Sequence, residues 1–218
     1  MADRRLMLVG GGTGGHVFPG VAVGEAWLAR WPDAELIYVG SARGLEARVV
    51  PALGWRFIGL DARRLKNAGA AERARSLATM PVALARGARL VAEERPTVVL
   101  GVGGYVSGPV VLAAALSRRP TAIAEQNARP GLTNRILGRF ARRIYTAFPE
   151  AADRLPRAKV RELGNPVRAS VRAAAAQASP AGAARRVLIL GGSQGARALN
   201  EKLPPALAAL RARFPDLT

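Results

Sequence analysis

Short apolar runs alternate with longer stretches of alanine, leucine and arginine along most of this chain. Between the runs, the sequence predicts helices at residues 17–30, 42–52, 71–94, 107–118, 131–141 and 149–155. The runs themselves have the length and composition of buried strands: RLMLVG, ELIYVG, WRFIGL, TVVLGVG, TAIAEQ, RRIYTAF and KVRELG. This alternation predicts an α/β fold in which helices cover both faces of a parallel sheet.

The alternation breaks after LGNPVR. Residues 169–184 are loosely composed, and RRVLILGG then restarts the pattern of strand, glycine turn and helix. One strand and one helix cannot enclose a core, because a parallel strand needs neighbours on both edges and helices on both faces. We therefore predict one domain at residues 1–163 and the incomplete start of a second at residues 164–218.

Composition narrows the function classes. The 218 residues are 50% hydrophobic, which is enough for a sizeable core, and the absence of cysteine excludes disulfides and thiolate metal sites. A cytoplasmic location is the default expectation, and no segment approaches the length of a membrane span. The net charge of +18 predicts an anionic partner: nucleic acid, a phosphorylated ligand or an acidic membrane. Scattered arginines and only 5% aromatic residues offer bases no stacking platform, which disfavours nucleic acid.

Three predicted strands run into glycine-rich turns: GGGTGGHVFPG at residues 10–20, GVGGYVSGP at 101–109 and GGSQGARAL at 191–199. Glycine lets the backbone approach a ligand closely, while free amide hydrogens and the dipole of the following helix attract negative charge. In an open parallel sheet such turns lie at the carboxyl ends of the strands, where ligands bind. The turns therefore predict phosphate or sugar sites, on both sides of a cleft between two domains.

The turns do not fully match two familiar glycine-rich motifs, the dinucleotide-binding motif and the P-loop. Residues 10–15 match G-x-G-x-x-G, but a dinucleotide site also needs an acidic residue at the end of the second strand, where this chain reads IYVGSARG. A nicotinamide enzyme is therefore disfavoured. A P-loop needs G-K-[ST], and the third turn lacks it, which disfavours ATP hydrolysis by that route.

Five stretches together resemble, in order, the motifs of the bacterial UDP-N-acetylglucosamine transferase family that converts lipid I to lipid II in peptidoglycan synthesis: GGTGGHVFPG, GVGGYVSGP, EQN followed by GLTNRILGRFA, LGNPVR and LILGGSQGAR. The resemblance runs from residue 6 to about residue 203. It implies a GT-B-type glycosyltransferase with a Rossmann-like N-terminal domain. Such an enzyme transfers N-acetylglucosamine to the C4 hydroxyl of lipid I with inversion, and it needs no metal or other cofactor.

The implied partners are UDP-N-acetylglucosamine, lipid I and an anionic membrane surface, with no nucleic acid. The enzyme would be peripheral on the cytoplasmic face of the membrane. Two alternatives stay open: a nucleotide-sugar or phosphate-binding module without catalysis, and a basic RNA-associated protein. In this family, uridine and sugar contacts come largely from the C-terminal domain, so these residues alone could bind acceptor without turnover.

The resemblance also implies roles for individual residues. The positions matching contacts to the nucleotide sugar are Thr13, Gly14, Gly15, Asn127, Arg168 and Ser193. The positions that would bind the acceptor are Gly103, Gly104, Tyr105, Ser107, Thr133 and Asn134. For Arg168 a solvated surface charge is the alternative, and glycine and serine at such turns often serve backbone geometry only.

Two residues are candidates for removing the proton of the acceptor hydroxyl. His16, the only histidine, has a suitable unperturbed pKa, with a helix-capping or structural role as the alternative. Glu125 ends an apolar strand, where partial desolvation would raise its basicity, or it orients substrate hydroxyls instead. The family usually has histidine immediately before this glutamate. Here Ala124 fills that place, so the contribution of that histidine is missing or replaced.

The helix predicted at residues 71–94 is basic and partly amphipathic. Its apolar positions and their flanking cations are Leu77, Met80, Pro81 and Leu84 with Arg73, Arg75, Arg86 and Arg89. Such a segment can lie on an anionic bilayer, or its leucines can face the sheet as in an ordinary surface helix. Together with the resemblance, the pattern favours a peripheral membrane patch.

Overall fold

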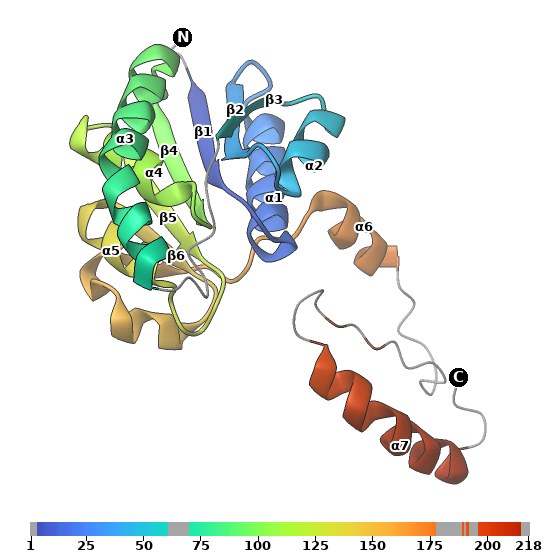
Figure 1. The fold of residues 1–218 in the computed structure, drawn as a ribbon. Helices are drawn as coiled ribbons and strands as arrows, with labels where there is room; N and C mark the ends of the chain where they lie inside the picture. Colours follow the sequence, from blue (N-terminus) through green and yellow to red (C-terminus); the bar gives the residue numbers. More distant parts are fainter. Residues whose placement is uncertain (1–3, 61–69, 178–188, 190, 192–195, 215–218) are drawn as a thin grey trace. The chain divides into compact units, whose positions relative to one another are not determined.

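The structure is a computed structural model that describes residues 4–60, 70–177, 189, 191 and 196–214. The chain divides into two compact units, Met1–Ala175 and Ala176–Thr218. The first unit contains the whole described sheet (Figure 1).

The described residues form one seven-stranded parallel sheet with the order β3-β2-β1-β4-β5-β6-β7. The strands are β1 Arg5–Gly10, β2 Glu35–Ser41, β3 Arg56–Leu60, β4 Val98–Gly103, β5 Thr121–Glu125, β6 Arg143–Thr146 and β7 Val160–Glu162. Each of the seven apolar runs is thus confirmed as a strand. Because the strand order reverses between β1 and β4, the carboxyl ends of these two strands frame the crevice where open α/β sheets bind ligands.

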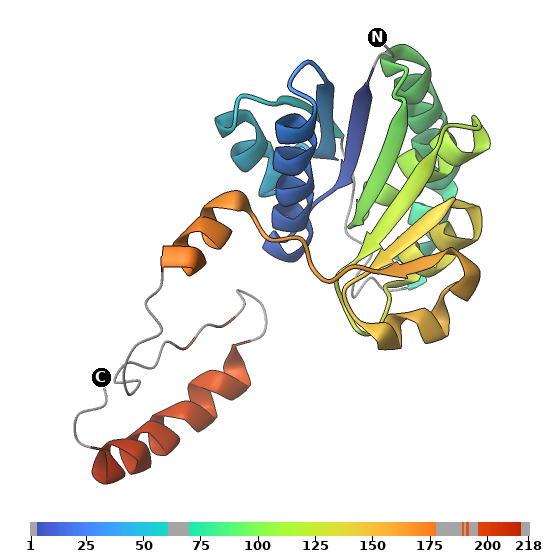
Figure 2. The same ribbon diagram turned by 180° about the vertical axis from the view of Figure 1, so that it is seen from behind.

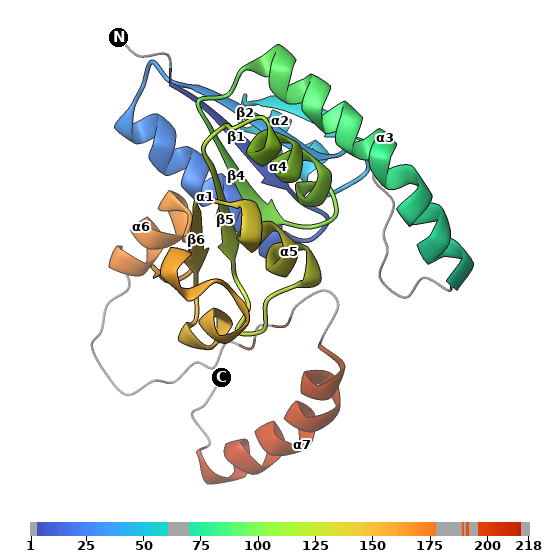
Figure 3. The same cartoon turned by 90° about the vertical axis from the view of Figure 1, so that its left-hand side faces the viewer.

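Helices cover both faces of the sheet, as predicted (Figures 1 and 2). The helical elements are α1 Gly14–Arg30, α2 Glu46–Ala52, α3 Ala70–Glu94, α4 Ser107–Leu116, α5 Leu132–Phe140, the 3-10 turns Pro149–Arg154 and Arg157–Lys159, α6 Ala169–Gln177 and α7 Arg197–Arg213. The helices α3, α4 and α5 lie on one side of the sheet, and Figure 3 shows α4 and α5 in front of the strands. The helices α1 and α2 lie on the other side. Among the described helices, none combines the length and apolarity needed to cross a bilayer.

Alternate side chains of the strands supply two hydrophobic cores. In β1, Met7 and Val9 belong to the core beneath α3, α4 and α5, whereas Leu6 and Leu8 belong to the core beneath α1 and α2. A strand that is buried on both faces reads as a continuous apolar run, because side chains point alternately to each face. This is why the strands stood out in the sequence without any polar alternation.

One helix differs from the sequence interpretation. The sequence analysis predicts no helix in the loosely composed residues 169–184, yet α6 occupies Ala169–Gln177. Alanine has the highest helix propensity, and a glutamate caps the new helix from outside: Glu25 Oε2 accepts the backbone N–H of Ala169 at 2.8 Å. An alanine-rich segment that resembles a linker can therefore form a helix when another residue accepts a backbone N–H of its first turn.

In the second unit, α7 confirms the helix predicted after the third glycine turn. The strand predicted at RRVLILGG and the turn that follows it lie outside the described residues, apart from Ile189 and Gly191. The assignment of residues 164–218 to a second domain stays a prediction.

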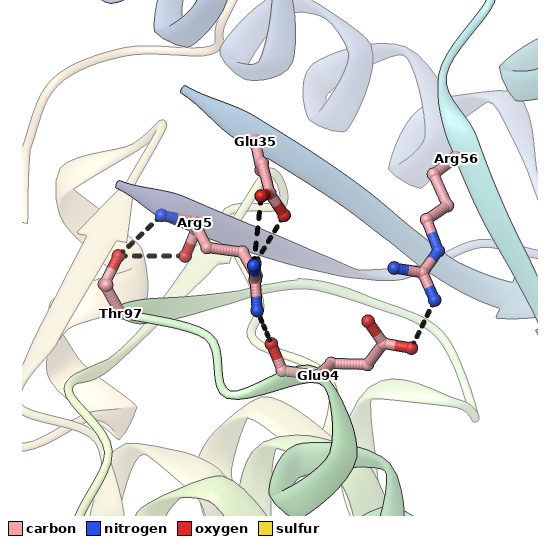
Figure 4. A network of polar contacts seen from close by, with 5 residues as sticks. All are labelled: Arg5, Glu35, Arg56, Glu94 and Thr97. Atoms are coloured by element: carbon pink, nitrogen blue, oxygen red, sulfur yellow. Dashed lines mark hydrogen bonds and ion pairs between the residues drawn. The ribbon is translucent and has the colours of Figure 1, made fainter. Parts of the chain in front are cut away.

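At the amino-terminal end of the sheet, Arg5 joins three segments (Figure 4). Its guanidinium donates to the two carboxylate oxygens of Glu35 at 2.5 and 3.0 Å and to the carbonyl oxygen of Glu94 at 2.6 Å. The hydrogen bond and charge of Arg5 lower the pKa of Glu35. A second ion pair joins the Glu94 carboxylate to Arg56 at 2.6 Å. Because Arg5 begins β1 and the first glycine turn follows its end, this charged network lies at the opposite edge from the glycine turns.

Candidate functional site at the glycine turns

The first two glycine turns pack directly against each other at the carboxyl ends of β1 and β4. The backbone N–H of Gly11 donates to the carbonyl oxygen of Gly103 at 3.2 Å. Gly103 and Gly104 both have positive φ angles, +97° and +89°, which residues other than glycine rarely adopt. The two turns therefore form one surface, with glycine required where the backbones meet.

Ser107, in the first turn of α4, holds this junction from below. Its side chain is fully buried, and its hydroxyl donates to the carbonyl oxygen of Val9 at 2.7 Å or to that of Gly103 at 2.9 Å. Both partners are acceptors, so the single hydroxyl proton is committed inside the protein. Of the two interpretations of this serine, ligand contact or backbone geometry, the structure favours the second.

Glu46, which the sequence analysis did not single out, lies fully buried under the first turn. Its Oε2 accepts the backbone N–H of Gly12 at 2.9 Å, and its Oε1 accepts that of Ser41 at 2.8 Å. A Cβ atom on Gly11 would lie 2.0 Å from the Glu46 carboxylate, and one on Gly44 would lie 2.4 Å from it. The only sequence signal was a glutamate inside the glycine-containing stretch VGSARGLE.

Because the carboxylate of Glu46 accepts the N–H of Gly12, that amide is not available to a ligand. Amides that follow it in the chain remain available. The N–H groups of Gly14 and Gly15, at the start of α1, make no hydrogen bond within the described part of the chain. Unpaired N–H groups at a helix start, reinforced by the helix dipole, are the usual basis of an anion site. Gly15 is exposed, which leaves this position open to a ligand.

His16 joins the ends of three strands. It lies half-buried in the first turn of α1, and its Nδ1 is 3.4 Å from Oε1 of Gln126, in the loop after β5. The ring also lies against the second glycine turn, because a Cβ atom on Gly103 would be 2.6 Å from Nδ1. Residues from the carboxyl ends of β1, β4 and β5 therefore meet at this imidazole.

Glu125, the other candidate base, is 2% exposed and fully engaged. Its Oε1 accepts the backbone N–H of Asn127 at 3.0 Å and the Asn127 side-chain Nδ2 at 2.8 Å. Its Oε2 accepts the N–H of Gly131 and the Nδ2 of Asn134, both at 3.0 Å. A carboxylate offers about four acceptor positions, and here four donors fill them. This geometry favours Glu125 as the anchor of the loop after β5.

The remaining predicted site residues lie around the same edge. Tyr105 and Thr133 are half-buried, and Asn127 is exposed, whereas Asn134 is buried and also donates to the carbonyl oxygen of Ala124 at 3.1 Å. The side chain of Ala124 belongs to the core beneath α1 and α2. The structure thus separates the predicted contacts into outward and inward side chains.

Arg168 contacts Phe18, an aromatic residue of α1 just after the first glycine turn. Its guanidinium carbon lies 4.4 Å from the centroid of the Phe18 ring, in a cation–π contact. A Cβ atom on Gly14 would in turn lie 3.2 Å from Phe18. Arg168 is therefore placed beside the turn, whereas Ser193 lies outside the described residues. Within the described chain, no three His, Asp or Glu side chains gather as a metal site would require.

Comparison with known proteins identifies the family of this chain. Residues 6–146 match the glycosyltransferase family 28 N-terminal domain. A UDP-N-acetylglucosamine--N-acetylmuramyl-(pentapeptide) pyrophosphoryl-undecaprenol N-acetylglucosamine transferase of Anaeromyxobacter sp. (strain K) is 48% identical over 96% of this chain and 56% of its own length. The chain thus spans about half the length of the curated relatives it matches.

Solved structures agree with the sequence comparison. The crystal structure of Acinetobacter baumannii MurG superposes with a TM-score of 0.69 at 31% identity, covering 94% of this chain and 55% of that one. The glycosyltransferase of kitacinnamycin superposes with a TM-score of 0.62 over 99% of this chain and 64% of its own, at 16% identity. The second likeness concerns the fold alone.

Proposed function

Because this chain belongs to glycosyltransferase family 28, we propose that it is part of a transferase that makes lipid II. The enzyme would transfer N-acetylglucosamine from UDP-N-acetylglucosamine to the C4 hydroxyl of lipid I, with inversion at the anomeric carbon and without a bound metal. The observation that carries the proposal is the 48% identity to a transferase of that name, extending over 96% of the chain.

The donor side of the reaction requires negative charge on the leaving diphosphate to be stabilised. The free N–H groups of Gly14 and Gly15, the dipole of α1 and the fixed cation of Arg168 can supply this charge stabilisation. Thr13 precedes these amides as the residue before α1, and Asn127 lies exposed beyond β5. We assign all five residues to the nucleotide sugar, with Ser193 contributing from the second domain.

The acceptor side requires the C4 hydroxyl to lose its proton as it attacks. In the proposed step, the hydroxyl oxygen forms a bond to the anomeric carbon from the face opposite the diphosphate. The bond from that carbon to the diphosphate oxygen breaks, and UDP leaves with the electron pair. His16 takes the hydroxyl proton, because Glu125 has its acceptor positions filled by loop donors.

We assign acceptor contacts to the half-buried members of the predicted set, Gly104, Tyr105 and Thr133, with the buried Gly103 shaping the turn. The turn of Gly103 and Gly104 faces the same surface as His16, which touches Gly103. Ser107 and Asn134 would act indirectly, because their polar hydrogens are bound to carbonyl or carboxylate oxygens within the protein.

The enzyme would act as a peripheral protein on an anionic membrane. On α3, Met80 and Val82 are 40% and 54% exposed, and Arg86 and Arg89 are exposed on the same helix. Leu90 and Val91 are buried in the core, so the end of α3 packs on the sheet while its middle presents apolar and basic groups outward. The side chains of Arg73, Arg75 and Leu77 lie outside the described residues.

The test is transfer of labelled N-acetylglucosamine from UDP to a lipid I analogue, with EDTA present. The protein should carry this chain together with the C-terminal half that its relatives have. We expect product, its loss in His16→Ala, and binding of the lipid I analogue without turnover by the 218-residue chain alone. Donor binding without any transfer by the longer protein would instead support the non-catalytic module.

A further inference from the structure

The side chain of Gln126 contacts the single histidine of the chain and has no role in the mechanism above. Its Oε1 lies 3.4 Å from Nδ1 of His16, across 110 residues of sequence. Gln126 is half-buried, and its Nε2 atom is buried without a hydrogen-bond partner in the described chain. The loop that carries it is held in place by the four donors on Glu125, so the amide is presented on a fixed support.

With the amide oxygen Oε1 toward the ring, this contact favours one of the two neutral tautomers of His16. An amide oxygen can only accept, so a hydrogen bond between Oε1 and the ring requires a proton on Nδ1. In a neutral imidazole the lone pair then lies on Nε2. Gly103 backs the Nδ1 edge of the ring, since a Cβ atom there would lie 2.6 Å from Nδ1 and 2.8 Å from Cε1. The Nδ1 edge is thus enclosed by Gln126 and Gly103.

We infer that Gln126 is a positioning residue, which holds neutral His16 in its Nδ1–H form and leaves Nε2 free to accept a proton. The use of that lone pair on the acceptor hydroxyl rests on the proposed function. The tautomer itself does not, because it is inferred from the contact of Oε1 with Nδ1 inside this chain.

Few charged groups belong to the segments that enclose the ring. The turn after β4 carries Tyr105, and the loop after β5 carries Arg129, which is exposed. Glu125 ends β5, and its carboxylate is engaged by that loop. The first two turns of α1, Gly14–Gly20, carry no charged residue besides His16. Gln126 and Gly103, which contact the imidazole, are both uncharged. A charge placed at position 126 should therefore act strongly on the ring.

The single histidine makes the inference directly measurable. In 15N-labelled 218-residue protein, long-range 1H–15N spectra contain one imidazole, whose two nitrogens report the tautomer without any assay of activity. Above the pKa of His16 we expect the Nδ1–H form in the native protein. In Gln126→Leu, which removes the acceptor, the populations should move toward Nε2–H. A native ring in the Nε2–H form would overturn the inference.

A second variant tests the same contact through charge. Gln126→Glu places a carboxylate against Nδ1, which favours the imidazolium and should raise the pKa of His16 by about one unit or more. The control Ser117→Glu adds the same charge at the far end of α4, roughly 15 Å from the start of that helix, and should leave the titration unchanged. Equal pKa values in Gln126→Glu and in the native protein would show that the two side chains are not in contact, and would also overturn the inference.

The activity arm separates this inference from the proposed function. In the longer transferase, Gln126→Glu should shift the acidic limb of the pH profile of kcat to higher pH, together with the pKa of His16. Gln126→Leu should lower kcat with little change in the KM for UDP-N-acetylglucosamine. If the spectra show the Nδ1–H form but no transfer occurs, the proposed function fails and the tautomer assignment stands. If transfer occurs and neither variant changes the kcat profile, the positioning role is wrong.

Discussion

Gly104 lies so close to Gly11 that a Cβ atom at position 104 would stand 2.4 Å from the Gly11 carbonyl oxygen. The obstructing atom belongs to the backbone of the other turn, so no side-chain rotation can relieve the clash. The φ angle of +89° at Gly104 adds a second penalty for any side chain. The packing of the two turns therefore depends on this glycine.

Gly104→Ala should destabilise the protein by about 2–5 kcal/mol, because overpacking costs roughly 1–3 kcal/mol and a left-handed backbone roughly 1–2 kcal/mol. The measurement is urea unfolding of the 218-residue chain. Gly131→Ala is the matched control, since Gly131 has a φ of −63° and no atom near its Cβ position. Equal stability of the two variants would contradict the close approach of the turns.

Glu46→Gln should cost about 2–3 kcal/mol, the typical penalty for leaving a buried donor without its charged acceptor. A glutamine can accept from Gly12 or from Ser41, but its NH2 group must then face the other N–H. Glu93→Gln serves as the control, because the pair of Glu93 with Arg89 is exposed and such pairs contribute only about 0.3–0.5 kcal/mol. Denaturant midpoints for the two variants measure the difference, and similar midpoints would argue against a buried carboxylate.

Tyr38→Phe should leave stability at neutral pH unchanged or slightly raised, and should make the protein more resistant to alkali. The Tyr38 hydroxyl is buried without a hydrogen-bond partner in the described chain. Burial, with a smaller contribution from Glu46, raises its pKa well above the usual value of 10. A raised folded-state pKa means that the free energy of unfolding is fully retained below pH 10 and falls as the pH rises above it.

Thermal unfolding between neutral and strongly alkaline pH measures this effect. Tyr145→Phe is the control, because Tyr145 is only partly buried against the same core. An alkaline loss of stability that is identical in Tyr38→Phe and in the native chain would assign the loss to other groups.

Sedimentation with liposomes tests the proposed membrane surface on α3. The 218-residue chain should bind vesicles that contain anionic lipid, and salt should weaken the binding. Arg86→Glu should weaken it by about fivefold or more, since one basic residue near an anionic surface is worth about 1 kcal/mol. Met80→Ser should also weaken binding, whereas Leu116→Ser, at the exposed end of α4, should not. Sedimentation that is independent of anionic lipid would reject the surface.

The fold was predictable because its signal is local. A strand buried on both faces is a short apolar run, and the glycine turns mark where the strands end, so all seven strands and the main helices could be placed from the sequence. The helix α6 was missed because its alanine-rich composition also suits a linker. Its capping group, Glu25, is 144 residues away and cannot be recognised from the local sequence.

The candidate site was predictable only as far as residue type and strand end allow. His16 and the glycines follow from the turns, but the contacts of Glu46 with Gly12 and of Gln126 with His16 span 34 and 110 residues. Sequence also cannot distinguish an inward hydroxyl from an outward one. Ser107 begins α4 among candidate ligand contacts, yet its proton is bound to main-chain carbonyl oxygens.

The buried carboxylate of Glu46 also shapes how this protein tolerates mutation. Its charge is balanced by peptide groups, so replacing a neighbouring side chain does not remove those two partners. What can be lost is the room that Gly11, Gly40 and Gly44 leave around it, because a methyl group at any of the three would collide with the Glu46 side chain. Saturation mutagenesis around this glutamate should therefore find its intolerant neighbours among glycines rather than among arginines, although the chain has 33 basic residues available for an ion pair.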